Sequence, residues 1–414
     1  MAPLSIVPIL ARQDLGVSSQ IRAQWADPSD IMSLLLLVGA DVVKGALAQQ
    51  TGGTNWLPPP VVFSFGWVAY SVSGILAAVG DKTFLPAPEL PAVVMSTEWG
   101  YQRANNSWVI NRLLRDYEEY WMPGQVKTRL SQMLDEAGRR RRRRAGLCVS
   151  VFEASRGKEA GVPDRDLLWY SGYAVAALQL SIAAIPWALH GVWEEFAVTA
   201  LGTALAFLTA SLPHWTHERW ACNKDSNKTF VVTRGNGAQH AIVIIGAGRG
   251  LDLEDLATSS EGLPGNRSTP FIYSGLAVMW CVLLITVCGI ENLTWYLLAV
   301  GTIGMIHTIV VAGAPREPGV FGIHLTYRDV FAEPKVMKTL QELEKAYPGC
   351  GRSMIKTFFP GSLREDEQVW WQDARERERA AKKDASNSMM LANAPTSKIE
   401  KLSASSTLSS STTL

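Results

Sequence analysis

Cysteines are few in this chain, and none of them forms a CxxC pair or stands at metal-ligand spacing. With five cysteines arranged in this way, neither a disulfide framework nor a zinc site is expected. The formal net charge is only +1, so the protein as a whole gives no argument for nucleic-acid binding. The first residues are apolar but lack the basic start of a secretory signal. We therefore expect no cleaved signal peptide.

Charge is nearly missing from six long stretches. A helix needs about 20 mostly apolar residues to cross a bilayer core. The sequence therefore predicts an α-helical polytopic membrane protein with about six transmembrane helices. Asp41 and Lys44 interrupt the first stretch, so a re-entrant or interfacial helix is the alternative there. The six windows are residues 31–48, 61–79, 167–189, 192–212, 271–290 and 293–312.

The distribution of positive charge predicts the orientation. The windows pair into three hairpins because the connections 49–60, 190–191 and 291–292 are short, and none of these contains lysine or arginine. Of the 39 Lys and Arg residues, only Lys44 lies inside a window. The positive-inside rule then places both termini and the long loops in the cytosol. The plasma membrane and an endomembrane are not distinguished.

The long loops predict a small cytosolic α+β module. Residues 229–234 and 240–245 are β-rich runs around Asn236-Gly237, the strongest short hairpin signal. Residues 147–152 are a candidate third strand, and apolar side chains recur at helical spacing in 107–121 and 125–137.

These predictions divide the chain into consecutive segments. They are 1–30, a cytosolic N-terminus; 31–79, the first hairpin; 80–166, a cytosolic loop with amphipathic helices; 167–212, the second hairpin; 213–269, a cytosolic loop with a β-hairpin; 270–312, the third hairpin; 313–383, cytosolic helices; and 384–414, a disordered tail rich in Ser and Thr.

A run of six arginines follows the predicted helices of the first long loop. With the preceding aromatic helix it is a candidate for binding anionic lipid headgroups on the inner leaflet. The competing interpretation is a solvated charge run in a flexible loop. The run consists of Arg139, Arg140, Arg141, Arg142, Arg143 and Arg144.

Two short motifs are candidates for a ligand site. GAGRG at 246–250 follows an apolar strand, but a dinucleotide fingerprint needs a third glycine where Leu251 stands. We expect a glycine-rich turn and no cofactor. His214, His217 and Glu218 could bind a metal at the end of the fourth window, but membrane di-iron enzymes need several such clusters. Polar residues at a helix end are the favoured interpretation.

Polar side chains inside the windows are the remaining candidates, because ionisable groups are costly in a membrane. They are Asp41 and Lys44, one turn apart, with Gln179 in the third window and His307 in the sixth. Asp41 and Lys44 could neutralise each other. A transport pathway and structural contacts between helices are both compatible with so small a set.

Three segments resemble a family. SFGWVAYSVSGILAAVGDK (64–82), TRGNGAQHAIVIIGAGRGLDLEDLA (233–257) and GIHLTYRDVF (322–331) are similar to uncharacterised multi-pass membrane proteins of filamentous fungi. The resemblance implies a fungal membrane setting. It brings no activity, cofactor or site residue.

Three functions are therefore open. The favoured one is a non-enzymatic membrane-anchored regulatory or partner-binding protein with a cytosolic protein partner. The second is a small transporter or channel that uses Asp41, Lys44 and His307. The third is a membrane metal enzyme at His214 and His217.

Overall fold

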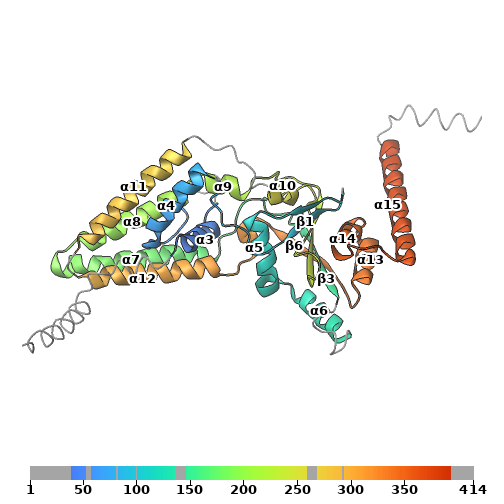
Figure 1. The fold of residues 1–414 in the computed structure, drawn as a ribbon, viewed down its shortest axis with the longest axis horizontal. Helices are drawn as coiled ribbons and strands as arrows, with labels where there is room; N and C mark the ends of the chain where they lie inside the picture. The colour runs from blue at the N-terminus through green and yellow to red at the C-terminus, as the bar shows by residue number, and fades with distance from the viewer. Residues whose placement is uncertain are drawn as a thin grey trace, which may run out of the picture.

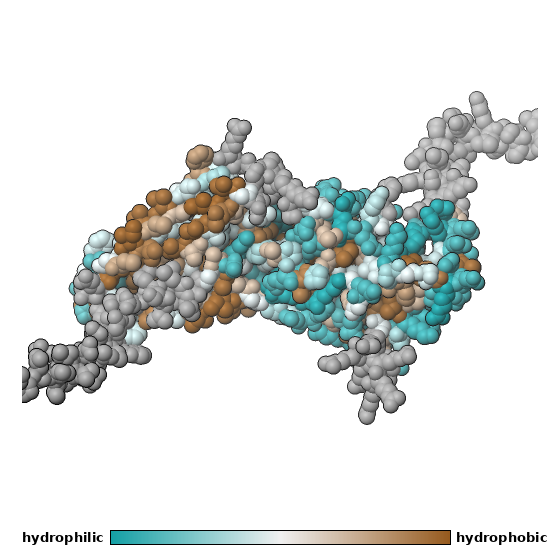
Figure 2. Space-filling model, in the orientation of Figure 1, coloured by the Kyte–Doolittle hydropathy of each residue, from teal (hydrophilic) through white to brown (hydrophobic). Residues whose placement is uncertain are grey.

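The computed structural model describes residues 39–52, 57–80, 83–98, 100–136, 146–258, 268–290 and 293–392, with the backbone alone for 381–392. These residues form a helical bundle and, beside it, a sheet that helices cover (Figure 1). On the face shown in Figure 2, hydrophobic residues gather on the bundle and hydrophilic ones on the other part. We call the two parts the bundle and the sheet domain.

Three helices of the bundle, α7, α11 and α12, are long and apolar enough to cross a membrane, within the described ranges. Large apolar side chains face outward on the bundle; Leu208 is 53% exposed and Ile285 is 71% exposed. Helices that are apolar on all sides suit a lipid environment. The bundle contains α3 (Ala40–Gln50), α4 (Gly66–Val79), α7 (Leu167–His190), α8 (Glu194–Ala210), α11 (Thr269–Cys288) and α12 (Thr294–Gly313).

The predicted windows at 167–189, 271–290 and 293–312 match α7, α11 and α12 closely. The window at 192–212 matches α8, which has 17 residues. Gly191, in the left-handed conformation, ends α7 so that α8 can fold back against it. Both α7–α8 and α11–α12 leave the sheet domain with their first helix and return with their second (Figure 1).

The first predicted hairpin does not appear as two spanning helices in the described residues. Helices α3 and α4 have 11 and 14 residues, and residues 61–64 of the second window are extended rather than helical. Three prolines, Pro58, Pro59 and Pro60, precede them, and proline cannot donate a helical hydrogen bond. Residues 31–38 of the first window lie outside the described residues.

The C-terminal end of α3 lies at the sheet-domain end of the bundle, whereas the sequence predicted the connection 49–60 at the opposite end. Val43 packs in the bundle core, but Ala48 packs in the core of the sheet domain. The Gln49 side-chain amide then donates to the backbone carbonyl of Ala314, just beyond α12, at 3.1 Å. Helix α3 therefore runs toward the sheet domain.

Residues 57–65 then enter the bundle as an extended strand, and α4 brings the chain back to the same end. The Tyr173 hydroxyl, near the start of α7, donates to the Pro58 carbonyl. Farther along α7, Gln179 donates to the carbonyl of Phe63 at 2.9 Å. After α4, the Phe84 amide donates to Glu218 in α9 (His214–Arg219) at 2.8 Å. We call residues 57–79 the re-entrant segment.

Three glycines make room for this segment. A Cβ atom on Gly172, Gly202 or Gly304 would lie less than 3.0 Å from Pro60 or Phe63, closer than real Cβ atoms come. Irregular backbone is tolerated at membrane depth only where protein or a water-filled cavity surrounds it. Here helices α7, α8 and α12 pack directly on it.

The sheet has six strands in the order β2-β1-β4-β5-β3-β6, and only β3 and β5 pair in parallel. The hairpin predicted around Asn236-Gly237 is confirmed as β4 and β5. The strand predicted at 147–152 is confirmed as β3. The sequence did not predict the other three. The strands are β1 (Val93–Ser96), β2 (Gln102–Ala104), β3 (Leu147–Ala154), β4 (Thr229–Thr233), β5 (His240–Ile245) and β6 (Leu325–Glu333).

Helices cover both faces of the sheet, so its central strands are buried on both sides. One apolar core lies between the sheet and α5 (Trp108–Asp116), the π-helical turn η1 (Tyr117–Trp121), α6 (Gly124–Glu136) and α10 (Leu253–Thr258). A second core lies under α13 (Val336–Ala346), α14 (Cys350–Phe358) and α15 (Glu365–Ala392).

Two predictions for the segments outside the windows are corrected. Val109, Leu113 and Tyr117, the apolar side chains at four-residue steps along α5 and η1, are 0% exposed. They pack on the sheet and are not free to lie on lipid. Helix α15 continues to Ala392, so the predicted disordered tail does not begin at Asp384. The run Arg139–Arg144 and residues 393–414 lie outside the described residues.

Candidate functional site at the junction of the bundle and the sheet domain

Arg316, three residues beyond α12, links four segments at the junction. Its guanidinium donates to both carboxylate oxygens of Asp166, with Nε to Oδ2 at 2.8 Å. It also donates to the Gln49 carbonyl at 2.6 Å, and its backbone amide donates to Asp116 at 3.0 Å. Arg316 thereby joins the ends of α12, α3 and α5 to the start of α7.

Asp166 is placed for this role because it is the N-cap of α7. Its Oδ1 accepts the Trp169 amide at 2.8 Å, which satisfies one of the free amides of the first helical turn. Burial alone would raise the pKa of Asp166, but the hydrogen bonds and charge of Arg316 outweigh burial and hold that pKa below its usual value.

Arg219, the last residue of α9, binds the C-terminal end of α3. It is 1% exposed and donates to the carbonyls of Ala48 (3.1 Å) and Thr51, and to that of Val320 at 3.2 Å. All three acceptors are backbone groups. A cation at a helix C-terminus is favoured by the free carbonyls and by the helix dipole. Burial, and next the charge of Arg316, lower the pKa of Arg219 to about 9.

Two arginines of α5 bind the C-terminal end of α12 in the same way. Arg112 donates to the Ala314 carbonyl at 2.7 Å, and Arg115 donates to the Gly313 carbonyl at 3.0 Å. Asp116 lies between them, 3.0 Å from Arg115 and 3.7 Å from Arg112. Burial raises the pKa of Asp116 despite these two cations.

The junction is therefore a rigid coupling between the two parts. Four arginines satisfy backbone carbonyls at the ends of two bundle helices, and two aspartates neutralise part of their charge. Removing one member of such a buried set leaves charges or carbonyls without partners, which is costly. The four arginines and two aspartates described at this junction include no nucleophile paired with a base.

The predicted metal candidates have other partners. His214 lies 2.8 Å from the Tyr273 hydroxyl, and Glu218 accepts the amides of Phe84 and Leu85. His217 is exposed. Burial lowers the pKa of His214 to about 3. In the described ranges, no group of three or more His, Cys, Asp or Glu side chains is placed to hold a metal ion.

The intramembrane candidates are dispersed. Asp41 is exposed on α3, and Lys44 is close enough to Glu218 to lower the pKa of that carboxyl, although burial raises it overall. Gln179 is fully buried and binds the carbonyls of Phe63 and Val300. His307 is within 2.9 Å of the Ser171 hydroxyl. The structure does not bring these four side chains to one site.

GAGRG forms a turn, as the sequence predicts. Gly246 donates to the Lys228 carbonyl, and Gly250 accepts the Ser226 amide. A Cβ atom on Gly246 would overlap the carbonyl of Ser226. The glycines thus allow a close approach between backbones just before α10.

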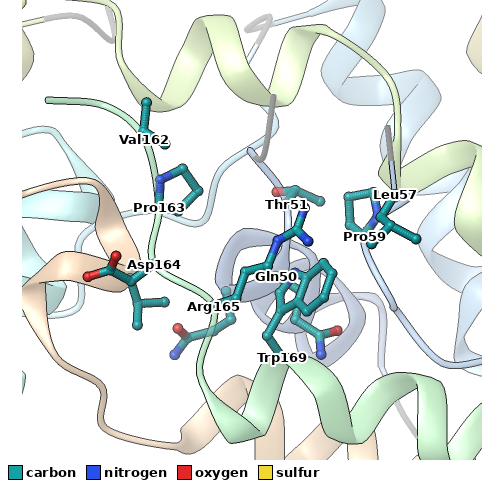
Figure 3. Close-up of a pocket in the computed structure, with 11 residues that line it drawn as sticks. Gln50, Thr51, Leu57, Pro59, Val162, Pro163, Asp164, Arg165 and Trp169 are labelled. Atoms are coloured by element: carbon teal, nitrogen blue, oxygen red, sulfur yellow. The ribbon is translucent and has the colours of Figure 1, made fainter. Parts of the chain in front are cut away.

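A pocket opens beside the junction, between the end of α3, the start of the re-entrant segment and the start of α7. Its empty space of about 450 Å³ includes solvent at its open mouth. In Figure 3 the Arg165 side chain extends across it toward Thr51, over the Trp169 ring. Its guanidinium carbon is 4.3 Å from the ring centroid. Leu57 and Pro59 form an apolar wall. We call this the interfacial pocket.

In the sequence, the arginines near the window ends count only as part of the positive charge that predicts the orientation. Arg165, Arg219 and Arg316 each lie within a few residues of a predicted window end, which was the available signal. Arg112, Asp116 and Gln50 gave no such signal. Arg112 and Asp116 bind Ala314 and Arg316, 200 or more residues away, and the burial of Gln50 cannot be read from the sequence.

Comparison of the chain with protein-family models, with curated proteins and with solved structures finds no match.

Proposed function

We propose that the protein is a non-enzymatic, membrane-anchored regulatory or partner-binding protein with six membrane-inserted helical segments. The sheet domain is its cytosolic binding part. The junction carries this proposal, because Arg112, Arg219 and Arg316 bind the sheet domain firmly to the ends of α3 and α12. A fungal membrane setting, from the sequence resemblance, is part of the same proposal.

A groove at the distal end of the sheet domain is the proposed partner site. It lies between the β4–β5 turn, the start of α13 and the start of α15. Its lining combines apolar Met337 and Phe359 with charged side chains of both signs, which are Lys335, Lys338, Arg364, Asp366 and Glu367. Aromatic residues and Met are enriched at protein interfaces. An extended segment of a cytosolic protein, apolar with flanking charged residues of both signs, fits this lining.

Site-specific crosslinking tests the groove. A photo-reactive residue at Lys338, in the full-length protein in its native membrane, is expected to give a discrete crosslinked species. Changing Phe359→Ala in that protein should reduce its yield severalfold, because hot-spot contacts are apolar and central. Yield is measured by immunoblot and the captured segment by mass spectrometry.

Lys356 provides the matched control, since it is also exposed but lies on α14 and does not line the groove. The photo-reactive residue there should give no discrete species. Equal crosslinking at Lys338 and Lys356, or a yield indifferent to Phe359→Ala, would reject the groove as the partner site.

Orientation is tested by labelling. The connection between α7 and α8 lies at the end of the bundle away from the sheet domain (Figure 1). In a cysteine-free background, His190→Cys should react with a membrane-impermeant maleimide added outside sealed cells, whereas Asp225→Cys should not. Both positions are exposed, so both cysteines should react with the maleimide to the same extent once the cells are permeabilised. Reaction of Asp225→Cys in sealed cells would place the sheet domain outside.

A transporter or channel is the second candidate, and the re-entrant segment favours it. Discontinuous helices at the bilayer midplane form the sites of many transporters. Two observations disfavour it. Residues 60–63 pack closely against Gly172, Gly202 and Gly304, which leaves no open space there. Asp41 and His307 do not lie at one common site. Solute flux in proteoliposomes would favour this candidate.

A further inference from the structure

We propose that the interfacial pocket binds the headgroup of a glycerophospholipid, taking the phosphate on Arg165 and Gln50 and requiring a headgroup that carries an N–H or O–H donor. The proposal does not depend on the groove or on the identity of the protein partner.

The position of the pocket suits a headgroup. Trp169 is in the first turn of α7, a helix long enough to cross a membrane. Tryptophan at such an end lies at headgroup depth. The apolar wall of Leu57 and Pro59 faces the polar side of the pocket. Glycerol and acyl chains would therefore continue along the apolar surface of the bundle.

Arg165 is a cation available for an anion. It is half-buried over Trp169, and in the described part of the chain it has no carboxylate partner, unlike Arg316 and Arg112. The neighbouring carboxylate, Asp164, is engaged by Lys158 at 2.6 Å. Arginine presents a planar fork of donors that matches phosphate oxygens.

Gln50 is a buried polar side chain of the pocket without a hydrogen-bond partner in the part of the chain that the structure describes. It is 2% exposed and lines the pocket, yet neither its amide nitrogen nor its amide oxygen has a partner among the described residues. The side-chain oxygen of Gln49 also lacks one. Buried polar groups of folded proteins are nearly always hydrogen-bonded. A phosphate oxygen would accept from the Gln50 nitrogen.

The free amide oxygens of Gln49 and Gln50 determine which headgroups fit the pocket. They need donors adjacent to the phosphate. Ethanolamine, serine and glycerol headgroups supply N–H or O–H groups at that distance, and choline supplies none. The pocket therefore distinguishes phosphatidylethanolamine, phosphatidylserine and phosphatidylglycerol from phosphatidylcholine.

Native mass spectrometry of the delipidated full-length protein in detergent tests this. Phosphatidylethanolamine is expected to bind at least tenfold more tightly than phosphatidylcholine of the same chains. Arg165→Gln should weaken that binding about tenfold, as loss of a charge-assisted contact does. Arg156→Gln, an exposed arginine nine residues earlier, should leave it unchanged.

Gln50→Leu is a second variant that tests the pocket if Arg165→Gln folds poorly. Replacing an unsatisfied buried amide by an apolar group should raise the melting temperature without lipid and abolish the rise that phosphatidylethanolamine gives the native protein. Equal binding of choline lipid would overturn the proposal, as would a native response in Arg165→Gln. Inorganic phosphate producing the same stabilisation as lipid would assign the pocket to a soluble phosphate instead.

Discussion

Gly304→Ala is expected to lower the stability of the detergent-solubilised protein by about 2–3 kcal/mol, the cost of overpacking a close-packed interior. A Cβ atom there would overlap the Phe63 carbonyl and lie less than 3.0 Å from the Gln179 nitrogen that binds it. The helix cannot move away, since α12 also packs on α3 and α7. Thermal unfolding with a thiol-reactive dye or by circular dichroism measures the loss.

Gly275→Ala is the matched control, because Gly275 is also inside a long bundle helix and has nothing within 4 Å of the added Cβ. Alanine is favoured over glycine in a helix by about 1 kcal/mol, so this variant should be as stable as the native protein or slightly more so. If Gly304→Ala matched Gly275→Ala, the extended residues 60–63 would not lie against α12.

The long bundle helices were predictable, and the re-entrant segment was not, for one physical reason. Hydropathy measures transfer into an apolar interior, and residues 61–79 are as apolar as a spanning helix. It carries no information about backbone conformation. The three consecutive prolines were the local cue for an extended strand. The hydrogen bond that holds this strand inside the bundle joins the Phe63 carbonyl to Gln179, 116 residues later in the chain.

The sheet shows the same division between local and long-range information. Asn236-Gly237 and the two flanking apolar runs are sufficient to predict the β4–β5 hairpin. Strand β6, in contrast, lies at a sheet edge and mixes charged and apolar residues without regular alternation. Its pairing with β3, from the first long loop, fixes its position. Cross-strand contacts, more than intrinsic preference, stabilise such strands.

The junction was visible only as charge near the window ends. Positive residues there have a topological reason that requires no contact, so their presence does not predict a partner. The partners are backbone carbonyls, which every sequence supplies. Arg316 reaches the Gln49 carbonyl across 267 residues of chain. Only the fold brings that acceptor to it.

Arg316→Gln should be the most damaging single change at the junction, with an expected loss of about 3–5 kcal/mol. It removes both bonds to Asp166 and the bond to the Gln49 carbonyl, and it leaves Asp166 without a cation. Asp166→Asn in the same chain should restore at least 1 kcal/mol, because the uncompensated carboxylate is then gone. Unfolding of the purified protein in detergent at pH 7 measures all three variants.

Arg103→Gln is the control for Arg316→Gln, because it removes an ordinary ion pair of the protein surface. Arg103 bonds Glu254 at 3.0 Å, but its side chain is 48% exposed on the sheet domain. Exposed pairs contribute about 0–1 kcal/mol because water and salt screen them, so this variant should unfold within a few degrees of the native protein. High salt should erase the small difference that remains. The loss in Arg316→Gln should largely persist, since the Arg316 side chain is only 1% exposed. Similar losses in both variants would mean that Arg316 holds the bundle to the sheet domain no more firmly than a surface contact does.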